Sequence, residues 1–362
     1  MSPLVCVGSD HIDFVGGIKH TEEPRQIDLS DLYAWVPEEG KLVVALNTFL
    51  HPANTAPEFD GSVEYSFEIR KVELKESLLS VPEVQKDFSA NVTCKPVGDV
   101  PNCVANVFRA GQLEIKNVSR AVAGRKADSF FLDVNWAEDT MKRVIDPNLK
   151  ADAPVPPPEP KNFSDVINIL NLTVEIDVAD VLGEEVELIA VAGESFTEEN
   201  GSRQRRDRVG RPEITNMTMG LEDVKLAYNQ APTFDLSSEQ ISNNKALIRY
   251  GVLGWDRQDN KDYKADWPHN GELHNLLDIL VLDALIVDTT KTCDFEEQSF
   301  LDIERGQGKH TSCGGRVPKD DVIDTMVSFY TAGINASNDA YGDGVDKTVR
   351  QPKDVWPYFV AP

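Results

Sequence analysis

The residues of this 362-residue chain that are best suited to chemistry are acidic side chains near its C-terminus. The segment 319–324 places three carboxylates within five residues, and the loop 338–346 adds three more. Clustered side-chain oxygens on glycine-containing loops suit a hard cation such as Ca²⁺. The loop lacks the bidentate Glu of an EF-hand, so a turn closed by Asx hydrogen bonds is the alternative. We therefore predict a calcium site that uses Asn338, Asp339, Asp343 and Asp346.

A second set of candidate metal ligands lies near the N-terminus. It consists of His11, Asp13, Asp28 and Asp31, which combine an imidazole with carboxylates. Such ligands bind borderline and hard divalent ions. An ion with an open coordination position could support a metal-dependent hydrolase or oxidoreductase. The alternative is that the two later aspartates cap turns beside a strand at 32–36.

Short signatures of catalysis are missing from the sequence. It contains no Gly-x-Ser-x-Gly elbow, His-Glu-x-x-His helix or Gly-x-x-x-x-Gly-Lys-Ser/Thr loop. Trp255 and Trp267 could stack on sugars, although anchoring of a long loop in the core is the simpler interpretation. The sequence therefore favours a binding or structural assembly protein without catalytic activity. A metal-dependent enzyme and a carbohydrate-binding protein are the alternatives.

Charge and hydropathy limit the partners. The formal net charge is -25, from 61 acidic and 36 basic side chains, which repels nucleic-acid phosphates and anionic membranes. No run of about eighteen apolar residues occurs, so no membrane span is predicted. The expected partners are copies of the same chain, another extracellular protein or a glycan.

Cysteine usage indicates an oxidising compartment, and hence a secreted or cell-surface protein. Cys94 and Cys103 flank a short loop rich in proline and glycine, which predicts a disulfide. Cys293 and Cys313 bracket a longer polar segment and are predicted to form a second one. Neither pair has zinc-ligand spacing. Cys6 would then be free, or bonded between chains.

Seven Asn-x-Ser/Thr sequons suggest a glycoprotein. Asn91, Asn200 and Asn335 lie near turn signals and are the favoured glycosylation sites. Asn171 and Asn216 lie in apolar surroundings, where a glycan would not fit.

Four arginines stand in or beside glycine turns close to carboxylates: Arg125, Arg208, Arg211 and Arg316. In so acidic a protein we expect buried or half-buried ion pairs that organise loops at one end of the sheets. An anion-binding site is the alternative. The arginine-rich segment 203–208 follows two glutamates and is predicted to be a solvated loop. The expected partners of the four arginines are Asp128, Asp133, Asp320 and Asp321.

The elements that must position these groups are mainly strands. Strict alternation of apolar and polar residues at 63–70 predicts a half-buried strand. Further strands are predicted at 41–47, 104–108, 130–134, 172–177 and 185–191, and helices at 137–145, 237–249, 273–282 and 320–332. The sequence thus predicts a mainly β fold of antiparallel sheets, sandwich or barrel-like, with a few short peripheral helices. We expect one large domain over 1–362, with a proline-rich surface crossing at 151–161.

Five patches of the sequence resemble one known family. They are 9–13 with 28–35, 124–133, 208–212 with Asn216, 283–288, and 314–324. In this order they resemble the bacterial and algal proteins known as domain of unknown function 4331. The resemblance implies a β-rich secreted or envelope-associated protein with no assigned activity. The chain departs from the family by its two expected disulfides and its proline-rich insert.

Overall fold

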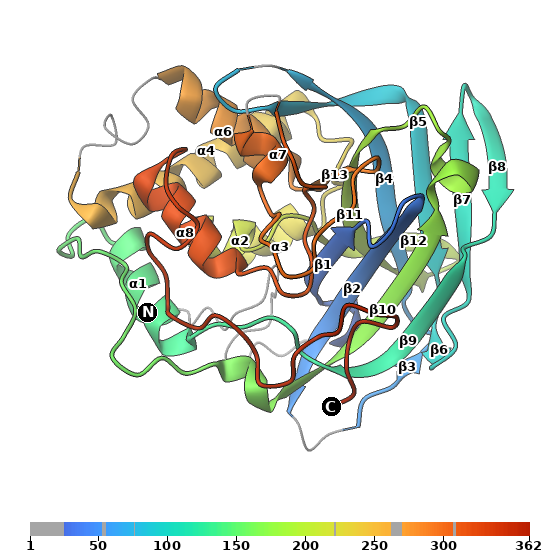
Figure 1. Ribbon diagram of the computed structural model, residues 1–362, viewed down its shortest axis with the longest axis horizontal. Coiled ribbons are helices and arrows are strands. Elements are labelled where there is room, and N and C mark those ends of the chain that lie inside the picture. Colours follow the sequence, from blue (N-terminus) through green and yellow to red (C-terminus); the bar gives the residue numbers. More distant parts are fainter. Residues whose placement is uncertain (1–24, 53–55, 76, 221, 262–269, 307–308) are drawn as a thin grey trace.

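The computed structural model describes residues 25–52, 56–75, 77–220, 222–261, 270–306 and 309–362. It shows a strand-rich protein in which two antiparallel sheets form an open sandwich, with the helices gathered beside them (Figure 1). The predicted fold class is therefore confirmed, as a sandwich and not as a closed barrel. The predictions for Cys6, His11, Asp13 and Trp267 concern positions outside the described residues.

The first sheet has four strands. In spatial order they are β1 (Leu29–Trp35), β2 (Lys41–Pro52), β10 (Ile167–Asp177) and β9 (Arg120–Ala127). Every residue of β1 is buried, as are the nine central residues of β10. A strand that is buried on both faces carries a continuous apolar run. This explains why residues 41–47, which belong to β2, show little alternation.

The second sheet is larger. Its path runs through β12 (Ser202–Val209), β11 (Leu188–Glu199), β4 (Glu64–Lys75), β5 (Val81–Cys94), β7 (Cys103–Arg109) and β8 (Gln112–Lys116), and β13 (Leu285–Asp288) also pairs with β11. The short strands β3 (Phe59–Asp60) and β6 (Val97–Gly98) form a separate ribbon. Both predicted disulfides, Cys94–Cys103 and Cys293–Cys313, are present. The first joins two residues directly opposite each other on β5 and β7.

In the part of the chain that the structure describes, the α-helices are α1 (Val134–Ile145), α2 (Ile214–Thr218), α3 (Glu222–Asn229), α4 (Ser238–Asp256), α6 (Asn270–Leu282), α7 (Asp302–Arg305) and α8 (Val322–Ala332). Short helical turns lie at η1 (Arg25–Ile27), η2 (Phe163–Val166), η3 (Val178–Leu182) and η4 (Arg257–Asp259). Helix α4 contacts α1, α2, α6 and α8, so it forms the centre of the helical side of the molecule. It begins with the capping box that the Ser-x-x-Gln pattern predicts at Ser237. Among the described residues, no helix has the length and apolar character needed to cross a membrane.

Two sequence predictions of local structure are wrong. Residues 130–134 form no strand, because Asp133 accepts a hydrogen bond from the Trp136 amide and thereby starts α1. The preceding apolar residues are buried without regular structure, so their pattern reports burial and not a strand. The segment 203–208 belongs to β12 and is not a loop. Its arginines fit a strand because Arg205 pairs with Glu194 on the adjacent β11, and Arg203 with Glu64 on β4, one strand further.

The proline-rich segment 151–161 runs along the surface and is bonded to the helical side of the molecule. Most of its side chains are exposed, and it has no regular secondary structure. The Trp136 indole donates a hydrogen bond to the Val155 carbonyl at 2.9 Å. The Gly342 amide donates one to the Pro154 carbonyl, also at 2.9 Å. The segment therefore holds the acidic C-terminal loop from its outer side.

Candidate metal centre

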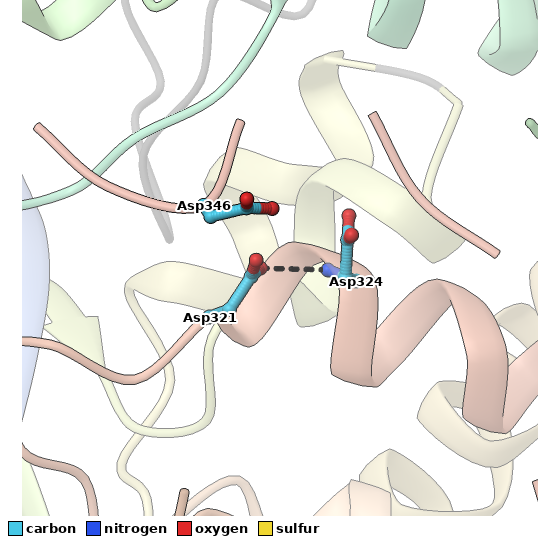
Figure 2. Close-up of side chains that lie close together, drawn as sticks. All are labelled: Asp321, Asp324 and Asp346. Carbon is cyan, nitrogen blue, oxygen red and sulfur yellow. Dashed lines mark hydrogen bonds between the residues drawn. The ribbon is translucent and has the colours of Figure 1, made fainter. Parts of the chain in front are cut away.

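Three aspartates from two separate segments converge at the start of α8. Asp321 directly precedes that helix, Asp324 belongs to its first turn, and Asp346 belongs to the loop that follows it (Figure 2). One carboxylate oxygen from each of the three lies within 4.8 Å of the other two. Asp346 is exposed and Asp324 is buried, so the group opens to solvent on one side only.

Helix capping fixes the first two of these residues. Asp321 is the N-cap of α8, and its carboxylate accepts a hydrogen bond from the Asp324 amide at 3.0 Å. A capping side chain satisfies one of the amides that lack a partner at a helix start, so this contact stabilises the first turn. The Asp324 carboxylate then accepts a hydrogen bond from the Asp343 amide at 2.9 Å, which brings the loop onto the helix.

The loop is tied from its other side by Asp343. Its two carboxylate oxygens accept hydrogen bonds from the Asp133 amide at 2.5 Å and the Val345 amide at 2.9 Å. Gly342 allows the close approach, because a Cβ atom there would lie only 1.8 Å from the Asp324 Oδ1 atom. The carboxylate of Asp324 thus occupies the space that any larger residue at 342 would need.

The electrostatics of this group are unfavourable without a cation. Burial, followed by the neighbouring Asp343 carboxylate, raises the pKa of Asp324 to about 7. Burial and then the Asp324 charge raise the pKa of Asp321 well above its usual range. Among the described residues, no lysine or arginine forms an ion pair with Asp321, Asp324 or Asp346. Like charges held this close must be protonated or neutralised by a bound ion.

This arrangement suits Ca²⁺ better than a softer metal. Among the described residues, the converging atoms are all carboxylate oxygens, without histidine or cysteine. Ca²⁺ takes about six to eight such ligands with flexible geometry. Three carboxylates can supply three to six of these ligands, and water or main-chain carbonyls complete such shells. Because Asp346 lies on the exposed side, a cation could enter from solvent.

The predicted loop ligands have different roles in the structure. Asp346 belongs to the converging group. Asp343 is buried and engages both carboxylate oxygens with backbone amides. Asn338 accepts a hydrogen bond from Arg305 at 2.5 Å, whereas Asp339 is exposed. Asp321 was expected to pair with an arginine. The capping pattern Asp-x-x-Asp at 321–324 is the sequence signal that could have identified Asp321 as a member of the converging group.

In the described part of the N-terminal candidate site, Asp31 pairs with an arginine. Asp31 is fully buried, and its carboxylate pairs with the Arg316 guanidinium at 2.9 Å. The guanidinium also lies over the Tyr33 ring, 4.3 Å from its centroid. Asp28 is buried where the chain enters β1. The cation beside Asp31 is therefore supplied by the chain itself.

The other predicted arginine pairs are partly right. Arg211 pairs with Glu304 at 2.5 Å, and Arg208 lies 3.9 Å from Asp283. Both arginines are buried, as predicted, but their partners differ from those expected. Arg125 is exposed in β9, which contradicts the prediction of a buried or half-buried position for it.

The expected acidic partners mainly fix backbone instead of pairing with arginine. Asp320 accepts hydrogen bonds from the Val317 amide at 2.8 Å and the Ser299 amide at 3.2 Å. Asp128 accepts one from the Phe130 amide at 3.1 Å. Burial raises the pKa of Asp320 to about 7, so this carboxyl group is organised by its loop and is poorly solvated.

Burial separates the tryptophan and sequon predictions that the structure favours from those that it disfavours. Trp255 is buried, and its indole donates a hydrogen bond to the Met217 carbonyl, so it anchors α4 and cannot stack on a sugar. Asn200 and Asn335 are exposed and accessible for glycosylation. Asn91 is half-buried, and its amide donates a hydrogen bond to Glu68 at 2.8 Å, which disfavours a glycan there. The disfavoured Asn171 and Asn216 are buried.

Comparison with known proteins adds little to this geometry. No family model matches the chain, and no curated protein matches it. One solved structure that was found is a presumed carbohydrate-binding protein from Bacteroides uniformis, with 6% sequence identity and a TM-score of 0.24. The match covers 54% of this chain and 73% of that one. A TM-score this low does not establish a shared fold, so no property of that protein is transferred.

Proposed function

We propose that this chain is an extracellular, disulfide-braced binding or assembly protein whose fold is stabilised by Ca²⁺ at Asp321, Asp324 and Asp346. The observation that carries the proposal is the convergence of three carboxylates, two of them largely withdrawn from water, without a lysine or arginine paired to them among the described residues. A divalent cation would relieve this repulsion and link the start of α8 to the C-terminal loop.

Two further features support an architectural role for the ion. The loop that carries Asp346 is already bonded to α8, to the Asp133 amide and to the proline-rich segment, so an ion there would stabilise a loop that contacts three separate parts of the chain. The two disulfides fit an oxidising, extracellular compartment. The N-terminal metal-enzyme alternative is less favoured, because Arg316 supplies the cation beside Asp31.

Calcium is expected to raise the melting temperature of the purified protein at pH 7.5. A ligand that binds only the folded state stabilises it by about 3 kcal/mol at a concentration of one hundred times its Kd. For a protein of this size we expect a rise of a few °C between EDTA and millimolar Ca²⁺, measured by differential scanning calorimetry. Identical melting curves in the two conditions would overturn the proposal.

The matched variants are Asp324→Asn and Asp339→Asn. The first removes a charge from the converging group, so it should abolish the response to Ca²⁺ while keeping the side-chain volume. The second changes an exposed aspartate outside that group and should keep the response. A calcium response that survives in Asp324→Asn would place the ion elsewhere. Elemental analysis that finds a transition metal instead would favour a metal-dependent enzyme.

The acidic group also predicts a pH dependence that calcium should remove. Without a cation, the pKa of Asp324 is about 7 in the folded state, above its usual value of 3.8, so the folded state binds more protons between these values. The free energy of unfolding in EDTA should therefore fall as the pH rises from about 4 to about 7, by an amount on the order of 2–3 kcal/mol. Urea unfolding across this range, with EDTA and with Ca²⁺, measures the effect. Parallel profiles in the two conditions would contradict it.

A further inference from the structure

The strand β8 is a free edge of the second sheet. Among the described strands it pairs only with β7, in a ladder that runs without interruption from Ala105 opposite Lys116 to Arg109 opposite Gln112. It lies at the margin of the molecule, away from the helices (Figure 1). An edge strand offers a row of backbone donors and acceptors that another strand can use.

This edge exposes apolar side chains and has neither a bulge nor a proline. Leu113 and Ile115 are 54% and 69% exposed, and Phe108, directly opposite Leu113, is 44% exposed. Proteins commonly protect such edges with a bulge, a proline or many charges. The opposite edge of the same sheet, β12, carries four arginines and pairs with β11 through a register shift. The sequence of β8, Gln-Leu-Glu-Ile-Lys, has a regular ladder and no proline.

The hairpin geometry decides which backbone groups point outward. Ala110 and Gly111 form a two-residue turn with φ values of 49° and 79°, and Arg109 and Gln112 close it. In such a hairpin the closing pair is hydrogen-bonded, and the pattern alternates along the ladder. Leu113 and Ile115 are therefore in non-hydrogen-bonded positions toward β7. Their N–H and C=O groups point to the free side.

We propose that two copies of this chain associate through antiparallel pairing of β8 with β8, with Ile115 opposite Ile115 of the second copy. In this register Glu114 of each copy faces Lys116 of the other. Sliding the strands by two residues would place Glu114 opposite Glu114, or Lys116 opposite Lys116. Opposite charges stabilise a cross-strand pair and like charges destabilise it, so the sequence selects one register.

The pairing is isologous and joins the apolar patches of the two copies. Leu113 and Ile115 lie on one face of β8, so the two patches become continuous across a two-fold axis. Strands of five residues give a contact smaller than the roughly 1,000 Å² of a stable interface. The association is therefore weak, with a dissociation constant in the micromolar to millimolar range. It does not rest on calcium, because β8 and the acidic group are in different parts of the fold.

Charge reversal tests the register. Sedimentation velocity across a range of concentrations should show a monomer–dimer equilibrium for the full chain, in a Cys6→Ser, Asn117→Gln background that removes the fifth cysteine and a neighbouring sequon. Glu114→Lys and Lys116→Glu should each raise the dissociation constant about tenfold. The double reversal should restore it, because opposite charges would again face each other at both cross-strand pairs. The proposal would be overturned by a protein that is monomeric at all concentrations, or by a dimer whose dissociation constant changes with neither single reversal.

Cysteine cross-linking gives an independent readout. Ile115→Cys places two thiols across the axis, where hydrogen-bonded partners have Cα atoms about 5.5 Å apart, within disulfide reach. Mild oxidation should therefore give a covalent dimer on a non-reducing gel. Leu113→Cys is the matched control, because its two copies would be separated by four residues along the strands and should remain monomeric. Cross-linking at 113 and not at 115 would overturn the register, and each variant's far-ultraviolet circular dichroism shows whether it folds.

Discussion

Replacing Arg316 with methionine is expected to lower the free energy of unfolding by about 3–5 kcal/mol. Arg316 is 1% exposed and pairs with the fully buried Asp31, and it also donates a hydrogen bond to the Leu32 carbonyl at 3.3 Å. Removing the guanidinium leaves the Asp31 charge in the core without this arginine. Breaking one partner of a buried pair costs far more than removing both. Urea unfolding at pH 7 measures the difference.

The double variant Asp31→Asn, Arg316→Met separates the pair from the packing. If the loss arises from an uncompensated charge, the double variant should be more stable than Arg316→Met alone. Burial raises the pKa values of Asp128 and Glu213, and the Arg316 charge opposes this rise, so its loss should make stability depend more steeply on pH near neutrality. Additive costs of the two single changes would show that the contribution of Arg316 is packing over Tyr33, not charge.

The fold was predictable to the extent that burial and periodicity report local structure. The strand at 63–70 alternates and the helix at 320–332 has one apolar face, and both elements are found close to these positions as β4 and α8. The strand prediction at 130–134 is wrong because the apolar residues there are buried in a segment without regular secondary structure. The strand β12 was missed because its arginines are matched by glutamates on other strands, a compensation that only the tertiary structure reveals.

The acidic segments of the candidate site could be predicted from the sequence, but the roles of the individual carboxylates could not. The sequence shows two acidic segments, and both contribute to the converging group through Asp324 and Asp346. It does not show which carboxylates are free, because that depends on long-range bonds. Asp343 is engaged with the Asp133 amide, more than two hundred residues away in the chain. The same holds for the buried arginine pairs. The burial of Arg316 could be inferred from charge and turn context, but its partner Asp31 could not.

Replacing Gly342 with alanine is expected to abolish the calcium response and to lower the free energy of unfolding by about 3 kcal/mol or more. A Cβ atom there would lie 1.8 Å from the Asp324 Oδ1 atom and 1.9 Å from its Cγ atom, so the carboxylate must leave its place. It would then lose the hydrogen bond from the Asp343 amide, which fixes the loop on α8. Overpacking of a well-filled site typically costs about 1–3 kcal/mol, and the lost bond to a charged group adds about 1.5–3 kcal/mol.

A second change distinguishes this clash from a backbone effect. In Gly342→Ala, Asp324→Ala the atoms that collide are gone, so stability in EDTA should recover toward that of Asp324→Ala alone. The calcium response should stay absent, because a ligand has been removed. Melting curves of the two single variants and the double variant, each with EDTA and with Ca²⁺, form a complete thermodynamic cycle. If the double variant is as unstable as Gly342→Ala, the glycine is required by the backbone of the loop, and the tight fit around the Asp324 carboxylate is not what selects it.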